Sequence, residues 1–291
     1  MFPDTSPKMI ISGFTIVRNA IKFHYPVVES IKSILPICDE FIVNVGDSDD
    51  DTLKLIQSIN SPKIRIIQTT WNMSQGSTVL SEQTNIALKE CKGDWAFYLQ
   101  SDEVVHEADL PRLKTRMQHC LADQNIDALR FKWLHFYGSF WRYRIDYGWY
   151  QKQDRIIRNN GQIESFGDAF AFRRKDGQPL RNRPTNCLLY HYGWVNTVAN
   201  MQDRIRNAQH IGYQDNNKNV SSGYGDLNRF PAYFGTHPAV MQNVLSQHLL
   251  SQQDLNQIRR HFWWHPAFWL HLRYKTFRRV SKAITEKSGT H

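Results

Sequence analysis

The chain has 291 residues, 41% of them hydrophobic, which is enough for one large or two small globular domains and argues against a disordered or fibrous protein. Its formal net charge of +9 is unevenly placed, because residues 255–291 hold eight Lys or Arg against one acidic residue and the rest is nearly neutral. A long basic groove for a polynucleotide is therefore poorly supported, and we expect no nucleic-acid partner.

The sequence begins MFPDTSPKMI, without a basic stretch that leads into an apolar one. No window reaches the roughly 18 to 20 apolar residues that a spanning helix needs, so we expect neither secretion nor a transmembrane anchor. The four cysteines show no C-x-x-C spacing, which favours free thiols in a reducing compartment and a cytoplasmic location.

Short β-rich runs alternate with helical stretches in the N-terminal part. Strands are predicted at 10–17, 40–45, 63–68 and 93–99, and helices from Pro26, at 52–59 and at 78–91. This alternation predicts an α/β fold with a mostly parallel sheet flanked by helices, whose ligands bind beyond the carboxyl ends of the strands. Asp47 follows the second strand, and Asp102 and Glu103 follow the fourth, so these acids should converge on one crevice.

After about residue 127 the pattern changes to longer strands, at 128–138 and 154–160, separated by the aromatic run FWRYRIDYGWY. We place a domain boundary near residue 230. The expected organisation is one α/β domain at 1–230, followed by a helical, aromatic and basic C-terminal extension at 231–291.

Adjacent carboxylates at a strand end are hard oxygen ligands that suit Mg²⁺ or Mn²⁺, and these cations commonly bridge to substrate phosphates. Asp102 is the leading candidate for a metal ligand, with Glu103 in support. The alternative is that both acids cap the helix that begins near Asp109 or lie in a solvated turn.

Three stretches, TIVRNA, DEFIVNVGDSDDDT and EQTNIALKECKGDWAFYLQSDE, occur in an order that resembles the nucleotide-sugar-binding half of a family 2 glycosyltransferase with the GT-A fold. The resemblance covers residues 10–107, with weaker similarity to about residue 200. It implies an inverting, divalent-metal-assisted transfer of a sugar from a nucleotide-diphosphate donor to an acceptor hydroxyl. Residues 1–107 would bind the donor and 108–230 the acceptor.

The resemblance also implies which residues contact the donor. They are Arg18, Asn19, Asp47, Gln83, Asn85, Gln100 and Asp102. In the family a D-x-D motif closes the fourth strand, and Asp102 matches its second Asp, whereas the first is Gln100 here. Gln100 can hydrogen-bond a ribose hydroxyl but brings no charge, so metal binding would be weaker or would rely on Glu103.

An inverting transfer needs one carboxylate to deprotonate the acceptor hydroxyl. Family members usually carry this base in the region that here reads RIIRNNGQIESFGDAFAF, which contains Glu164 and Asp168. We prefer Asp168, since a Gly-Asp turn between apolar stretches would partly desolvate the carboxylate and raise its pKa. A turn without chemistry is the alternative.

The run LLYHYGWV (188–195) carries a histidine in an apolar strand, and His191 is the third metal-ligand candidate. Its alternative is a core histidine satisfied by a backbone carbonyl. His106 and Glu107 are expected to cap and orient the helix that follows them, and a role as metal ligands is the alternative.

The aromatic run suggests a platform for the acceptor sugar, although core packing explains at least half of its rings. The acceptor candidates are Trp141, Arg142, Arg144 and Trp149.

In the C-terminal extension, residues 266–282 form a basic amphipathic pattern, typical of a helix on the inner face of an anionic membrane. That location would suit a lipid-linked or envelope-glycan acceptor in polysaccharide or lipopolysaccharide synthesis; packing of this helix on the domain is the alternative.

A sugar nucleotidyltransferase and a nucleic-acid-binding protein are the two alternatives to the transferase. A sugar nucleotidyltransferase would share the α/β design, but it normally has a Gly-rich phosphate loop after the first strand, where TIVRNA offers none. A non-catalytic nucleic-acid-binding protein is supported by net charge alone.

Overall fold

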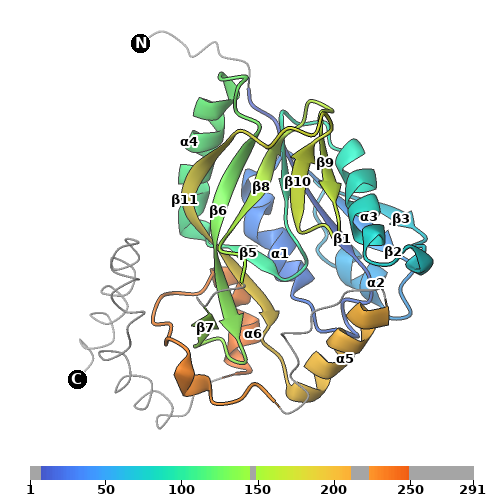
Figure 1. Ribbon diagram of the computed structural model, residues 1–291, viewed down its shortest axis with the longest axis vertical. Helices are drawn as coiled ribbons and strands as arrows, with labels where there is room; N and C mark the ends of the chain where they lie inside the picture. Colours follow the sequence, from blue (N-terminus) through green and yellow to red (C-terminus); the bar gives the residue numbers. More distant parts are fainter. Residues whose placement is uncertain (1–7, 145–148, 211–222, 249–291) are drawn as a thin grey trace.

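The computed structural model describes residues 8–144, 149–210 and 223–248 (Figure 1). Within these residues a nine-stranded sheet has the order β3-β2-β1-β4-β8-β6-β11-β5, with β7 paired to β6, and β9 and β10 form a separate hairpin. The strands are β1 (Ile11–Val17), β2 (Glu40–Gly46), β3 (Ile64–Thr69), β4 (Trp95–Tyr98), β5 (Glu103–Val105), β6 (Ala128–Tyr137), β7 (Tyr143–Arg144), β8 (Lys152–Arg158), β9 (Ile163–Phe166), β10 (Ala171–Arg174) and β11 (Asn182–Trp194).

Helices cover both faces of the sheet (Figure 1). They are α1 (Val27–Ile34), α2 (Thr52–Gln57), α3 (Thr78–Lys89), α4 (Leu110–Leu121), α5 (Val198–His210) and α6 (Gln242–Ser246). Apolar side chains of α1, α2 and α4 share one hydrophobic cluster, whereas those of α3 share another with the β9–β10 hairpin. The predicted α/β class, a mostly parallel sheet flanked by helices, is confirmed.

The central strand β4 shows why this sheet is buried on both faces. Trp95 and Phe97 belong to the cluster under α1 and α4, while Ala96 and Tyr98 belong to the cluster under α3. Successive strand residues point to opposite faces, so a strand covered on both sides is apolar throughout. Fully burying a side chain such as that of Phe97 contributes about 1.5–3 kcal/mol.

Strand direction brings the ends of distant segments together. β1 is parallel to β2 and β4, while β8 lies antiparallel between β4 and β6, so β6 runs in the same direction as β4. β11 is parallel to β6. The carboxyl ends of β1, β4, β6 and β11 therefore lie at one edge of the sheet.

The described start of the predicted C-terminal extension packs on the domain. Tyr233 and Met241 share a hydrophobic cluster with Phe136 and Tyr190, and the backbone N–H of Ala239 donates to Glu107 Oε2 at 2.9 Å. Packing is therefore continuous across the predicted boundary near residue 230, and the division at that residue stays a prediction. The basic stretch 266–282 lies outside the described residues. No helix in the described part of the chain has the length and apolar character needed to cross a membrane.

Candidate functional site

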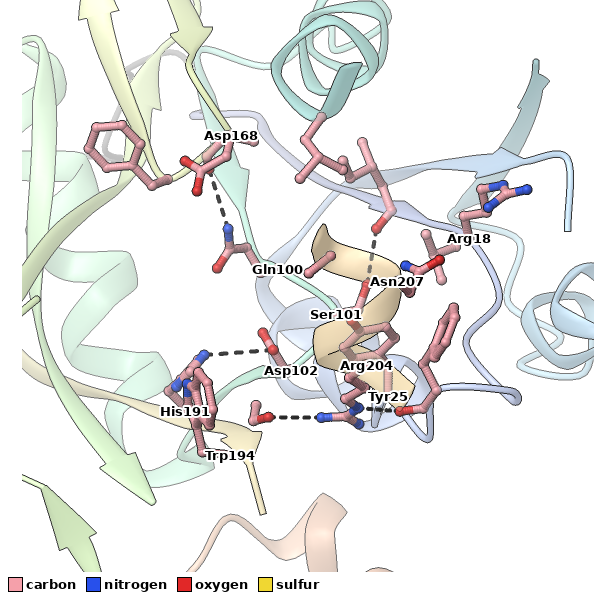
Figure 2. Close-up of a pocket in the computed structure, with 18 of the residues that line it drawn as sticks. Arg18, Tyr25, Gln100, Ser101, Asp102, Asp168, His191, Trp194, Arg204 and Asn207 are labelled. Atoms are coloured by element: carbon pink, nitrogen blue, oxygen red, sulfur yellow. Dashed lines mark hydrogen bonds and ion pairs between the residues drawn. The ribbon is translucent and has the colours of Figure 1, made fainter. Parts of the chain in front are cut away.

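A cavity of about 330 Å³ opens at the edge where the carboxyl ends of β1, β4, β6 and β11 meet. Its wall includes Arg18 after β1, the Gln100–Asp102 turn after β4, and the Asp168 turn between β9 and β10. The ends of β6 and β11 and one face of α5 complete it. Figure 2 shows Gln100 between the two acids, Asp168 and Asp102. The cavity occupies the position where open α/β sheets bind ligands.

Asp102 and His191 face each other across one end of the cavity (Figure 2). Asp102 Oδ2 lies 3.6 Å from His191 Nε2, and their side chains are 16% and 10% exposed. Burial raises the pKa of Asp102, while the guanidinium of Arg204 acts in the opposite direction. Residues 89 positions apart in the sequence therefore present an oxygen and a nitrogen ligand atom to the same space.

Arg204 of α5 is a buried cation at the same end of the cavity (Figure 2). Its guanidinium donates to three backbone carbonyls, those of Phe23, His24 and Gly193, and lies 4.3 Å from the ring centre of Tyr25. These bonds tie α5 to the loop after β1 and to the end of β11, and they place a fixed positive charge near Asp102.

Asp168 is half-buried in the turn between β9 and β10 and lines the cavity. The residues on either side of it, Gly167 (φ 62°) and Ala169 (φ 60°), both adopt the left-handed conformation, which is uncommon for alanine. Ala169 O accepts from Gln100 Nε2 at 3.4 Å, which links this turn to the turn after β4. Such local backbone strain is often found where a side chain is held for function.

The acidic loop after β2 lies beside Arg18. Arg18 Nε donates to the carbonyl of Asp47 at 3.0 Å, and Asp47 Oδ1 accepts from the backbone N–H of Trp71 at 3.1 Å. Asn19 is buried and exchanges two hydrogen bonds with Asp49. The pKa of Asp49 is lowered to about 2, mainly by the hydrogen bond from Lys22 and to a smaller extent by the one from Asn19. Arg18 lines the cavity, whereas Asn19 and Asp47 do not. Asp47 holds the Arg18 side chain, and Asn19 holds the acidic loop through Asp49.

The prediction that Glu103 supports a metal is wrong. Its side chain is fully buried, and both carboxylate oxygens accept from the guanidinium of Arg155 at 2.8–3.1 Å. The same carboxylate accepts from the backbone N–H of Gln100, and Arg155 donates to the carbonyl of Phe170 at 2.9 Å. Glu103 therefore joins the two turns that carry Asp102 and Asp168, and its charge is already neutralised.

Replacement of Arg155 by Met should lower the free energy of unfolding by about 3–5 kcal/mol, because it leaves the Glu103 carboxylate buried without its partner. The double variant Arg155→Met/Glu103→Leu should regain most of that stability, since both buried charges are then absent. Urea unfolding followed by circular dichroism measures both changes. A double variant no more stable than the single one would contradict this role.

Three further predicted site residues do not reach the cavity. Gln83 is buried and bonds to Asn44 and Thr69, and the side-chain amide of Asn85 exchanges two hydrogen bonds with the backbone of Ser165. Glu164 lies on β9 and pairs with Arg173 at 2.8 Å. Gln83 and Asn85 therefore do not make the predicted donor contacts, and their amides hold α3 against the sheet and the hairpin. Glu164 lies outside the cavity and is not in place to act as the alternative base.

The four acceptor candidates divide into two pairs. Arg142 is 6% exposed and bonds to the carbonyl of Phe230 and to Asn228 Oδ1, and Trp141 packs edge-on against His237. Arg142 and Trp141 both face the 223–248 segment and not the cavity, so they do not bind the acceptor as predicted. Trp149 lines the cavity, and the guanidinium of Arg144 stacks on it at 4.7 Å.

His106 caps the short 3₁₀ helix Glu107–Asp109 that leads into α4, because its Nδ1 accepts from the backbone N–H of Ala108 at 3.2 Å. The capping prediction is confirmed for His106, whereas the Glu107 carboxylate accepts from the backbone N–H of Ala239.

The Asp102–His191 pair fits a divalent cation. Their separation of 3.6 Å exceeds a hydrogen bond, yet both atoms can reach one cation at about 2.1–2.2 Å. Among the residues that the structure describes, no three His, Cys, Asp or Glu side chains converge on one point. Mg²⁺ usually takes one or two protein carboxylates as ligands, and substrate phosphate oxygens and water complete its shell.

Sequence reasoning missed several polar residues of the cavity wall, and two of them, His135 and Arg204, leave a signal in the sequence. Trp133, His135 and Tyr137 alternate along β6, so they share one face of the strand, and the first two line the cavity. Arg204 occupies an apolar stripe of α5 together with Met201 and Ile205. A cation within such a stripe is a sign of a polar site.

The sequence model of the family described as Glycosyl transferase family 2 matches residues 14–178, which is more than half of the chain. A comparison with curated proteins finds no match.

Solved structures show weaker likeness. The crystal structure of S. aureus TarS 1–349 is 16% identical over 70% of this chain and 65% of that chain, with a TM-score of 0.42. The complex of TarS 1–349 with UDP-GlcNAc is 22% identical over 45% and 36%, with a TM-score of 0.35. Glucosyl-3-phosphoglycerate synthase from Mycobacterium tuberculosis, crystallised with Mn²⁺, UDP and phosphoglyceric acid, is 21% identical over 43% of each chain, with a TM-score of 0.32. The matched region is less than two thirds of each of these chains.

Proposed function

The chain belongs to glycosyl transferase family 2, and from this premise we propose that its cavity binds a nucleotide-diphosphate sugar and transfers the sugar to an acceptor hydroxyl with inversion. The observation that carries the proposal is the meeting of Asp102 and His191, 3.6 Å apart, at the carboxyl edge of the sheet. Family membership does not favour the nucleotidyltransferase or nucleic-acid alternatives.

Each wall of the cavity has a distinct task in this proposal. Arg18 and Asn19 from the loop after β1 and Asp47 from the loop after β2 flank the base and ribose. Gln100 hydrogen-bonds a sugar or ribose hydroxyl. Asp102 and His191 would hold Mg²⁺ or Mn²⁺, and the bound cation would supply positive charge that stabilises the diphosphate leaving group. Arg204, fixed by three carbonyls, adds positive charge at the same end.

Asp168 is the proposed base. It lies in the cavity wall across from Asp102, separated from it by Gln100 (Figure 2). Its carboxylate takes the proton of the acceptor hydroxyl while that oxygen attacks the anomeric carbon, and the nucleoside diphosphate departs on the opposite side. Trp149 and Tyr150 supply aromatic faces on which an acceptor sugar can pack.

The acceptor is proposed to be a glycan or lipid-linked hydroxyl of the type used in cell-envelope polysaccharide or lipopolysaccharide synthesis. The basic amphipathic sequence at 266–282 supports this class, since it suits the anionic inner face of a membrane, with the catalytic domain on the cytoplasmic side.

A thermal-shift screen of UDP-, GDP-, CMP- and dTDP-sugars, with and without Mn²⁺, tests the function. We expect one nucleotide series to raise the unfolding temperature, and Mn²⁺ to increase that shift. An unfolding temperature that no nucleotide sugar changes, with or without Mn²⁺, would overturn the proposal.

Gly193→Ala should weaken Mn²⁺-dependent donor binding by about 10-fold or more. A Cβ on Gly193 would lie 2.5 Å from Asp102 Oδ2 and 2.8 Å from His191 Nε2, so both ligand atoms would have to move. Isothermal titration with the donor, with and without Mn²⁺, measures the effect, and metal-free affinity serves as the internal control. Unchanged donor affinity in the presence of Mn²⁺ would show that the metal does not bind between Asp102 and His191.

A further inference from the structure

His135 is a buried neighbour of His191 to which neither the family resemblance nor the reaction assigns a role. The two residues are aligned in the parallel pairing of β6 with β11, and they are 4% and 8% exposed. Their Nδ1 atoms lie 3.0 Å apart, a hydrogen-bond distance. The other ring nitrogen of His135, Nε2, lies 2.5 Å from the carbonyl oxygen of Tyr150.

A histidine that ligates a metal is neutral, and for two neutral rings these contacts assign the protons. A carbonyl oxygen only accepts, so His135 Nε2 carries the hydrogen that faces Tyr150. A neutral imidazole has a single N–H, which leaves a lone pair on His135 Nδ1. The hydrogen between the two Nδ1 atoms must then belong to His191, and His191 Nε2 presents its lone pair toward Asp102 Oδ2, 3.6 Å away (Figure 2).

Trp133 fixes the plane of the His191 ring. The two rings are stacked, with centroids 5.2 Å apart and planes within 11° of parallel, while Trp133 meets His135 edge-on. His191 can therefore neither rotate freely nor exchange its tautomer without loss of the bond to His135.

We propose that His135 is a positioning residue, which holds His191 in the tautomer whose Nε2 is open to a divalent cation beside Asp102. This inference rests on the proposed function. It extends the site from its two ligands to a chain that runs from the Tyr150 carbonyl through His135 to His191. Partners of this kind behind a histidine ligand typically change metal affinity by about 10–100-fold.

Two substitutions separate positioning from packing. His135→Asn retains an amide oxygen close to the position of Nδ1, which can accept from His191, whereas His135→Leu fills the space without an acceptor. With UDP present, free Mn²⁺ measured by electron paramagnetic resonance should show affinity about 10–100-fold weaker for His135→Leu and near wild type for His135→Asn. UDP affinity without metal is the reference for each variant, because His135 also lines the cavity.

Equal loss in both variants, or no loss in His135→Leu, would overturn the role of His135 while leaving the proposed function intact. Wild type that binds neither Mn²⁺ nor any nucleotide would overturn both. Long-range ¹H–¹⁵N NMR spectra of the wild-type protein provide a test that depends on no variant. We expect the Nδ1–H tautomer for His191 and the Nε2–H tautomer for His135, and the opposite assignment would end the proposal.

Discussion

Asp168→Asn is expected to reduce sugar transfer by about 10²–10⁴-fold, because an amide of the same shape cannot accept the proton of the acceptor hydroxyl. Donor binding should persist, since Asp168 lies across the cavity from the Asp102–His191 pair (Figure 2). Release of nucleoside diphosphate from the donor identified by the thermal-shift screen measures the rate. Isothermal titration measures the binding.

Glu164→Gln is the matched control for Asp168→Asn. Glu164 is on the same hairpin but outside the cavity, paired with Arg173. Its replacement should leave the rate near wild type. A rate that falls in Glu164→Gln and survives in Asp168→Asn would reverse the assignment of the base.

Asp102→Asn is expected to abolish Mn²⁺-dependent stabilisation by the donor and to slow transfer by about 10³-fold, equivalent to about 4 kcal/mol of lost charge stabilisation. The neutral amide is a poor ligand for a hard cation, and it leaves Arg204 without its nearby acid. Thermal shifts with and without Mn²⁺ and the diphosphate-release assay check the two effects.

Asp94→Asn is the control at the opposite end of β4. Asp94 precedes the strand, and its Oδ2 accepts from the backbone N–H of Ile10 at 2.8 Å, a bond that an amide oxygen can retain. Metal-dependent stabilisation should persist in this variant. If Asp102→Asn also keeps it, the metal does not bind where we propose.

Local patterns predicted the fold because each pattern has a direct physical cause. The continuous apolar run of β4 and the acids that follow its carboxyl end could be read from WAFYLQSDE without knowledge of the partner strands. The resemblance to family 2 glycosyltransferases is confirmed by the family match at 14–178. The predicted strand at 154–160 corresponds to β8, but nothing local shows that it inserts antiparallel between β4 and β6.

Side-chain direction explains the errors at the site. Asp102 and Glu103 are adjacent in the sequence, yet one faces the cavity and the other the core, where Arg155 neutralises it. The motif could not show this difference, because Arg155 comes from β8, 52 residues away. Likewise, Gln83 and Asn85 look like ligand contacts in a helix, whereas their amides satisfy buried groups of neighbouring strands.

Contacts between side chains of neighbouring strands also could not be predicted from local sequence. His135 and His191 are 56 residues apart, and their contact follows from the register of β6 with β11. Only the alternation of Trp133 with His135 hinted that β6 contributes to the cavity.

The pulsed electron paramagnetic resonance spectrum of Mn²⁺ bound together with UDP tests the central claim most directly, because it detects nitrogen atoms coordinated to the metal. The account predicts ¹⁴N coupling from one imidazole in the wild-type protein, and loss of this coupling in His191→Leu. A spectrum without nitrogen coupling, or coupling that survives in His191→Leu, would contradict it.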